Sequence, residues 1–113
     1  MKTKILICLF FFALTMQAQS QERKSKNEQW LVLVNGNCEM CKARIEKAAM
    51  QTKGTKYASW DVHSKTLKLI FNPYKTSKDT LAKAILAVGH DVDTLKAAEE
   101  QYENLHFCCQ YRE

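Results

Sequence analysis

The 113-residue sequence lacks an apolar run long enough to cross a bilayer. Its longest apolar stretch, Ile5 to Leu14, is about half of the ~20 residues that a membrane-spanning helix requires. The segment that follows, residues 19–28, is polar and has no apolar periodicity. We therefore expect no transmembrane anchor in the mature chain.

The sequence also lacks a concentration of charge of one sign. Its formal net charge is +5, with 17 Lys and Arg against 12 Asp and Glu, and the lysines are spread along the chain instead of forming a stripe. Proteins that bind nucleic acid gather basic residues on one face. The charge distribution therefore does not indicate nucleic acid as a partner.

The N-terminus has the three parts of an export signal. Lys2 and Lys4 supply a basic start, the apolar stretch has the length of a signal core, and Ala18 is a small residue at a cleavage point. We expect residues 1–18 to be a signal peptide and residues 19–28 to be a flexible segment, which predicts an exported, periplasmic protein. The remaining length suits one domain.

Four of the five cysteines lie outside this signal, in two close pairs: Cys38 with Cys41, and Cys108 with Cys109. A disulfide within such a close pair would do little to stabilise a fold, and the spacing is more typical of metal ligands. Cys38 and Cys41 stand where an apolar strand gives way to a helix, and the positive end of a helix dipole favours thiolate over thiol. Thiolates bind soft metals, but the same spacing also serves dithiol redox chemistry or a small local disulfide.

Hydrophobic patterning predicts the order strand, helix, strand, strand, helix, strand. An apolar run forms the first strand, an amphipathic helix follows the first cysteine pair, and two alternating segments form a hairpin. The last strand is weak, since only Val92 and Leu95 are apolar in it. The predicted elements are residues 29–35, 41–51, 56–63, 66–71, 76–88 and 91–95. This order is that of an α+β, ferredoxin-like βαββαβ sandwich, in which two helices cover one face of an antiparallel sheet.

A short helical extension is expected after the sixth element. Apolar residues recur there at helical spacing, at Leu95, Ala98, Tyr102 and Leu105, which predicts a third short helix that folds back on the domain. We place the core itself between Trp30 and Leu95.

These residues resemble the heavy-metal-associated domain, a family found in copper chaperones, metal-pumping ATPases and periplasmic mercury-binding proteins. The resemblance rests on the Cys-x-x-Cys that opens the first helix, on Ile45-Glu46 within that helix, and on Gly89-His90-Asp91-Val92, where the family commonly has a Gly-Tyr-Asp type sequence. It covers residues 29–97 and leaves residues 98–113 as a cysteine-containing extension. The resemblance implies that Cys38 and Cys41 bind one soft cation in a surface loop.

One departure from that family concerns the loop before the first cysteine. The family usually has Gly-Met-Thr there, whereas this chain has Asn35-Gly36-Asn37, which removes the methionine expected to anchor the loop to the core. Met40, inside the motif, is the candidate to compensate.

His90 is a candidate additional ligand. In the resembling fold the loop after the second helix lies beside the metal loop, so that an imidazole there could complete or tune a two-thiolate site. The alternative is an ordinary loop histidine.

Cys108 and Cys109 are further candidate ligands. Adjacent side chains in an extended segment point to opposite faces, and a disulfide between neighbours is strained, so we expect no bridge between them. Either the tail folds back and brings these thiols to the first pair, or it docks through Phe107 and Tyr111. In the second case the thiols would pair with another molecule or bridge to the first motif.

The sequence thus predicts a non-enzymatic, exported protein that binds a soft metal ion and buffers or delivers it. Copper(I) is the first choice because two thiolates suit its low coordination number, with zinc(II) or mercury(II) as alternatives. A metal-transporting ATPase or an efflux protein is the expected partner.

Two other classes of protein remain open. A thiol–disulfide oxidoreductase also places Cys-x-x-Cys at a helix start, but here only one short strand precedes the motif and no aromatic residue stands directly before Cys38. The single proline, Pro73, is better explained as a residue that ends the preceding strand in a loop than as a proline that packs beside the dithiol. The other class is a structural adaptor domain of an efflux assembly.

Overall fold

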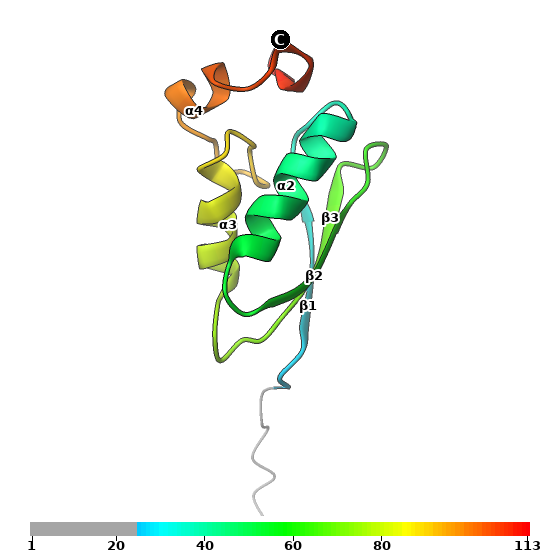
Figure 1. Ribbon diagram of the computed structural model, residues 1–113, viewed down its shortest axis with the longest axis vertical. Coiled ribbons are helices and arrows are strands. Elements are labelled where there is room, and N and C mark those ends of the chain that lie inside the picture. The colour runs from blue at the N-terminus through cyan, green and yellow to red at the C-terminus, as the bar shows by residue number, and fades with distance from the viewer. Residues whose placement is uncertain (1–24) are drawn as a thin grey trace, which may run out of the picture.

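The computed structural model describes residues 25–113 as an α+β domain with a C-terminal extension (Figure 1). The predicted signal peptide, residues 1–18, lies outside the described residues, as does most of the predicted flexible segment. Within residues 25–113, no helix combines the length and the apolar character needed to cross a membrane.

Within the described residues, three antiparallel strands form the sheet, in the spatial order β1-β3-β2. They are β1 (Glu28–Leu33), β2 (Thr55–Trp60) and β3 (Thr66–Phe71). Leu69, in the central strand, pairs with Trp30 on one side and with Ala58 on the other. The predicted hairpin is confirmed, and its alternation has the expected effect, because Leu67, Leu69 and Phe71 all point into the core.

Two helices cover one face of this sheet, as predicted (Figure 1). Helix α2 (Glu39–Gln51) buries Cys41, Ile45, Ala48 and Ala49, which recur at helical spacing. Helix α3 (Lys78–Leu86) buries Leu81, Ala82 and Ile85, and the Ser77 hydroxyl caps its start by accepting from the Thr80 N–H at 3.2 Å. The fold class predicted from the sequence is therefore confirmed.

The sixth element, expected as a strand over residues 91–95, is reduced to isolated bridges in the described part of the chain. Val92 bridges Val34 and also Leu95. The segment turns back on itself, because Val92 and Leu95 exchange backbone hydrogen bonds and Asp93 takes a φ of 51°. Because this segment has only two apolar residues, it buries too little apolar surface to stabilise an extended strand.

The C-terminal extension folds back over one end of the domain. It contains the short helix α4 (Glu99–Glu103) and the 3₁₀ turn η1 (Phe107–Cys109), and Figure 1 places it beyond the N-terminal end of α2. Gly89 makes this packing feasible, since its φ is 96° and a Cβ there would lie 2.6 Å from the Gln101 carbonyl oxygen.

The core continues into this extension. Tyr102, Leu105 and Cys109 are buried, whereas Leu95 is 49% exposed. The expectation that the core ends at Leu95 was therefore wrong, because the tail supplies apolar side chains that the weak sixth element does not.

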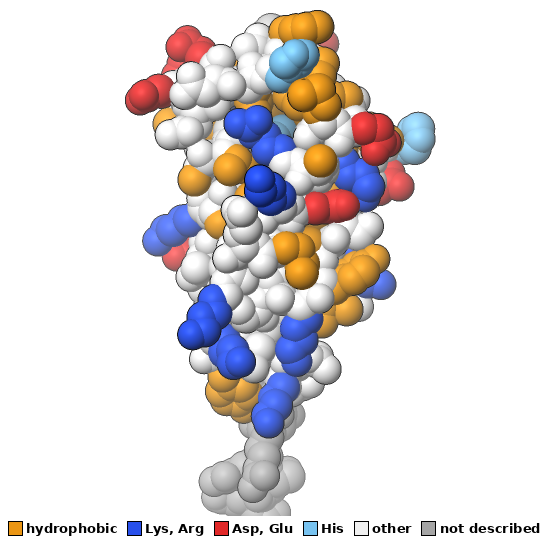
Figure 2. Space-filling model, in the orientation of Figure 1, with side chains coloured by type: hydrophobic (Ala, Val, Ile, Leu, Met, Phe, Trp, Pro, Cys, Tyr) orange, Lys and Arg blue, Asp and Glu red, His pale blue; other side chains and the backbone are white. Residues whose placement is uncertain are grey.

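The charged side chains on the surface form no single basic stripe on the face drawn in Figure 2, as the sequence indicated. Lys and Arg side chains are spread over both halves of the view in Figure 2, with acidic side chains among them in the upper half only. Hydrophobic and histidine side chains gather at the end of the molecule that carries the C-terminal extension.

Candidate metal centre

Cys38 and Cys41 are positioned by the start of α2. Cys38 is the N-cap residue, with extended backbone (φ −147°, ψ 177°), and its carbonyl accepts the first helical hydrogen bond, from Lys42. Cys41 lies in the first turn and is fully buried. The Cys41 sulfur accepts from the Asn37 N–H at 3.3 Å, and the two Sγ atoms are 3.6 Å apart.

The loop before Cys38 is held by Trp60 and not by a methionine. The Trp60 indole N–H donates to the Val34 carbonyl at 2.9 Å. A Cβ on Gly36 would lie 3.0 Å from both the Trp60 ring and Cys41, so only glycine fits between them without displacement. The expectation that Met40 compensates was wrong, since its side chain is 52% exposed.

The tail brings its two thiols to the same place. The Sγ of Cys38 is 3.3 Å from that of Cys108 and 3.7 Å from that of Cys109. The three sulfurs lie within 4.8 Å of one another. Cys108 and Cys109 both face this point because they lie in a 3₁₀ turn, not in the extended segment that would have sent them to opposite faces.

Of the alternatives left open for the tail, the structure thus has the folded-back arrangement. Its four described cysteines are free thiols. Of the two residues expected to dock the tail, Phe107 does not, since it is 79% exposed, whereas Tyr111 does, through hydrogen bonds with Gly89 and Asp91.

These four sulfurs form what we call the thiol cluster: Cys38, Cys41, Cys108 and Cys109. Two sulfurs bound to one tetrahedral ion at about 2.3 Å are about 3.8 Å apart. The separations from Cys38, 3.6, 3.3 and 3.7 Å, approach that spacing. The donor set therefore fits a soft metal ion.

The electrostatics of the cluster make Cys38 its thiolate. Burial opposes ionisation of Cys38, but hydrogen bonds from the Cys41 backbone and from the three neighbouring thiols outweigh it, so that its pKa falls from 9.0 to about 7. The pKa of Cys108 is raised, first by its hydrogen bond to Cys38. Burial raises the pKa of Cys109 well above its ordinary range. The Cys38 thiolate is therefore stabilised by hydrogen bonds from the protonated thiols of Cys108 and Cys109.

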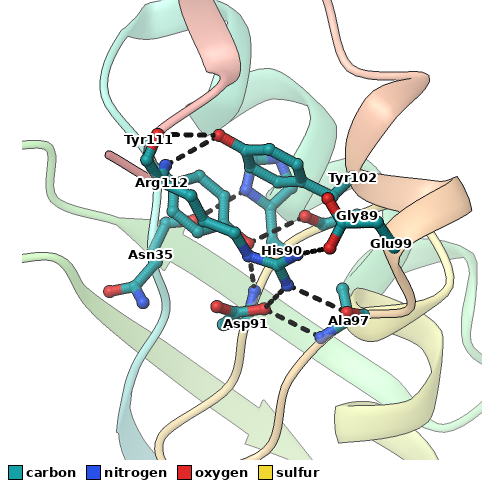
Figure 3. A network of polar contacts seen from close by, with 9 residues as sticks. All are labelled: Asn35, Gly89, His90, Asp91, Ala97, Glu99, Tyr102, Tyr111 and Arg112. Carbon is teal, nitrogen blue, oxygen red and sulfur yellow. Dashed lines mark hydrogen bonds and ion pairs between the residues drawn. The ribbon is translucent and has the colours of Figure 1, made fainter.

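A set of contacts that we call the C-terminal latch holds the tail in this position (Figure 3). The Tyr111 hydroxyl donates to the Gly89 carbonyl at 2.9 Å and accepts from the Asp91 N–H at 2.8 Å. The Arg112 guanidinium donates to the Asp91 carboxylate and to the Ala97 carbonyl, both at 2.8 Å. These contacts fix the chain directly after the two tail thiols.

His90 lies beside the C-terminal latch and is not part of the thiol cluster. It is fully buried, and its Nδ1 donates to the Asn35 carbonyl at 2.7 Å. Its ring stacks on Tyr111 with centroids 5.7 Å apart. Burial lowers the pKa of His90, which favours the neutral imidazole. This histidine therefore joins the metal loop to the tail.

Two contacts of the site were not anticipated from the sequence. The His106 Nδ1 is 3.3 Å from the Cys108 sulfur, and the Met40 Sδ is 3.5 Å from the same sulfur. The spacing His106-x-Cys108 was a signal available in the sequence. The approach of Met40 was not, because it depends on where the tail returns.

The chain resembles parts of longer proteins of known type. No known family profile matches it. It is 31% identical over 71 residues to a copper-exporting P-type ATPase of Staphylococcus saprophyticus, and 31% identical over 75 residues to one of Staphylococcus epidermidis. These alignments cover 63% and 66% of this chain but 9% of each ATPase.

Solved structures share the fold. A CopZ metallochaperone matches with a TM-score of 0.56 at 24% identity, covering 57% of this chain and 98% of that one. The water-soluble region of the P-type ATPase CopA from Bacillus subtilis matches with a TM-score of 0.57 at 27% identity, covering 62% and 47%. Oxidized MerP from Ralstonia metallidurans matches at 0.51 and 20%, covering 58% and 96%. The chain therefore shares its fold with these metal-binding domains, and its sequence is similar to a small part of the copper-exporting ATPases.

Proposed function

We propose that this protein binds copper(I) through Cys38 and Cys41, with Cys108 and Cys109 as additional thiolate ligands, and that it buffers the ion or delivers it to a partner. The observation that carries the proposal is the position of Cys38, whose sulfur lies within 3.7 Å of three other sulfurs. Thiolates select soft ions such as copper(I).

The comparisons favour copper over zinc(II) and mercury(II). The similar ATPases are described as copper-exporting, and a similar small protein of Bacillus anthracis as a putative copper-ion-binding protein. A thiol–disulfide oxidoreductase gains no support from these likenesses. The proposed role is therefore binding and transfer without a catalytic step.

Delivery would proceed by exchange of thiolates. An incoming partner thiolate replaces one cluster sulfur at a time, so that the ion is never free. Cys38 and Cys108 are half-buried whereas Cys41 and Cys109 are buried, so exchange would start at the first two. A metal-transporting ATPase or an efflux protein, met by the exported protein in the periplasm, is the proposed acceptor.

Native mass spectrometry of the reduced protein with copper(I), zinc(II) and mercury(II) tests this proposal. We expect the protein to retain copper(I) against a chelator that removes zinc(II), and to lose that retention when Cys38 and Cys41 are replaced by serine. The proposal would be wrong if the reduced protein bound no metal, or if the double variant bound copper(I) as well as the wild type does.

A further inference from the structure

Cys108 has two further soft donors beside it, both on exposed side chains. The Met40 Sδ lies 3.5 Å from the Cys108 sulfur, and the His106 Nδ1 lies 3.3 Å from it. A thioether, a thiolate and an imidazole are all ligands that copper(I) accepts. The three residues come from α2 and from the tail, so the folding back of the tail creates this arrangement.

These donors exceed what one ion can use. The thiol cluster supplies four sulfurs, and Met40 and His106 raise the number of soft donors to six. A tetrahedral ion takes four ligands. The sulfurs of Cys38, Cys108 and Cys109 all lie within 4.8 Å of one another, and Cys41 joins them through Cys38 at 3.6 Å, whereas Met40 and His106 contact Cys108. The donors therefore divide into an inner and an outer set that share Cys108.

Burial does not explain why Met40 and His106 lie beside this thiol, although the His106 ring also packs against Phe107 with centroids 4.4 Å apart. Met40 is 52% exposed, and His106 is exposed as well, so neither side chain gains much from burial there. By contrast, Cys41 and Cys109 of the inner set are 0% and 1% exposed. The outer set thus faces solvent while the inner set faces the core.

We propose that Met40, Cys108 and His106 form a second, outer copper(I) site, with the Cys108 thiolate bridging the outer and the inner ion. This inference rests on the proposed function of the inner cluster and adds a site to it. The inner site fills first, because its thiolates outnumber those of the outer site. Zinc(II) does not fill the outer site, since its protein ligands are Cys, His and carboxylates and one of the three donors here is a thioether.

Stoichiometry measured by native mass spectrometry tests the outer site. The reduced protein is titrated with copper(I), and separately with zinc(II), in the presence of a weak copper(I) chelator. We expect two copper(I) ions per monomer but a single zinc(II). Met40→Leu and His106→Ala should each reduce the copper count from two to one. Met50→Leu, at the far end of α2 and 47% exposed, and His63→Ala, in the exposed β2–β3 turn, are the matched controls and should keep two.

The outcomes separate this proposal from the function on which it rests. Three results would overturn the outer site and leave the inner site intact. They are one copper(I) per monomer in the wild type, two copper(I) ions retained in Met40→Leu and His106→Ala, and two ions found only in a dimer. No copper(I) in the wild type would overturn both. X-ray absorption of the two-copper form should show nitrogen scattering that disappears in His106→Ala, and nitrogen scattering that persists in that variant would count against the outer site.

Discussion

Cys38 and Cys108 are 70 positions apart in the chain, and their sulfur atoms are 3.3 Å apart. The first is fixed by the start of α2 and the second by a 3₁₀ turn in the tail. Cys38 also contacts the sulfurs of Cys41 and Cys109. It is therefore the residue through which the two cysteine pairs meet.

Because Cys38 is the centre of the cluster, its loss should cost more copper(I) affinity than the loss of a tail thiol. We expect Cys38→Ser to weaken binding by on the order of 100-fold, about 2.8 kcal/mol, and Cys109→Ser by about tenfold. The tail must also be held in place, which lowers the net gain from its thiols. Competition against a copper(I) chelator measures both. Equal losses would contradict the central role of Cys38.

The thiol of Cys38 should react with iodoacetamide at lower pH than those of Cys108 and Cys109. Its pKa is about 7, so its alkylation rate should rise through neutral pH and level off above it. Cys109 should stay unreactive, since burial raises its pKa. Cys108→Ala removes a hydrogen bond to the thiolate and should shift the Cys38 midpoint upward. Mass spectrometry of the alkylated peptides gives the pH profile of each site.

Arg112→Ala should release the tail. The guanidinium donates to the Asp91 carboxylate, which is buried, and to the Ala97 carbonyl, so its loss should cost about 1–3 kcal/mol of folding free energy. Urea unfolding measures this cost, and faster hydrogen exchange at residues 105–111 would locate it. The control is Lys83→Ala, which removes an ion pair with Asp79 in which both side chains are 74% exposed and should change little. Unchanged exchange in Arg112→Ala would count against the latch.

Acid should weaken the same latch. Burial favours the neutral form of Asp91, but hydrogen bonds from Arg112 and from the Ala97 N–H outweigh it and hold the pKa of Asp91 below its ordinary value. The stabilisation by this carboxylate is therefore fully present above the unfolded-state pKa of about 3.9 and is lost as the pH falls through the lower folded-state value. The difference in unfolding free energy between wild type and Asp91→Asn should close below about pH 4. A gap that is constant down to pH 2 would refute this.

Leu105→Ala should show that the tail belongs to the core. Leu105 is 4% exposed and packs at Gly89, so its truncation should cost about 2–4 kcal/mol. Leu95→Ala is the matched control, because Leu95 is 49% exposed and its truncation should change stability by less than about 0.5 kcal/mol. Thermal or urea unfolding checks both. Similar costs would mean that the core ends where the sequence suggested.

Much of the domain could be predicted because its signals are local. The alternation of Leu67, Leu69 and Phe71 defines a strand, and the spacing of Cys41, Ile45 and Ala49 defines a helical face. The weak apolar content of residues 91–95 was also visible, although it produced bridges instead of a strand. Cys38 and Cys41 were placed at the helix start for the same local reason.

The folding back of the tail was predicted from its apolar spacing, but the contacts that the tail makes could not be predicted, because they join distant residues. Whether Cys108 and Cys109 face the same point depends on a 3₁₀ turn that no periodicity indicates. The stacking of His90 on Tyr111 and the pairing of Asp91 with Arg112 join positions about twenty apart. Such contacts are chosen by packing in three dimensions.

Trp60 gives this protein an optical reporter beside the thiol cluster. Its ring lies against Gly36, which belongs to the loop before Cys38, and close to Cys41. The other tryptophan, Trp30, lies in β1 with Lys78 near its ring. Indole emission is quenched by nearby soft ions, so a Trp30→Phe variant would report the filling of the cluster through a single fluorophore. Loading and unloading could then be followed in real time, without any label attached to the thiols.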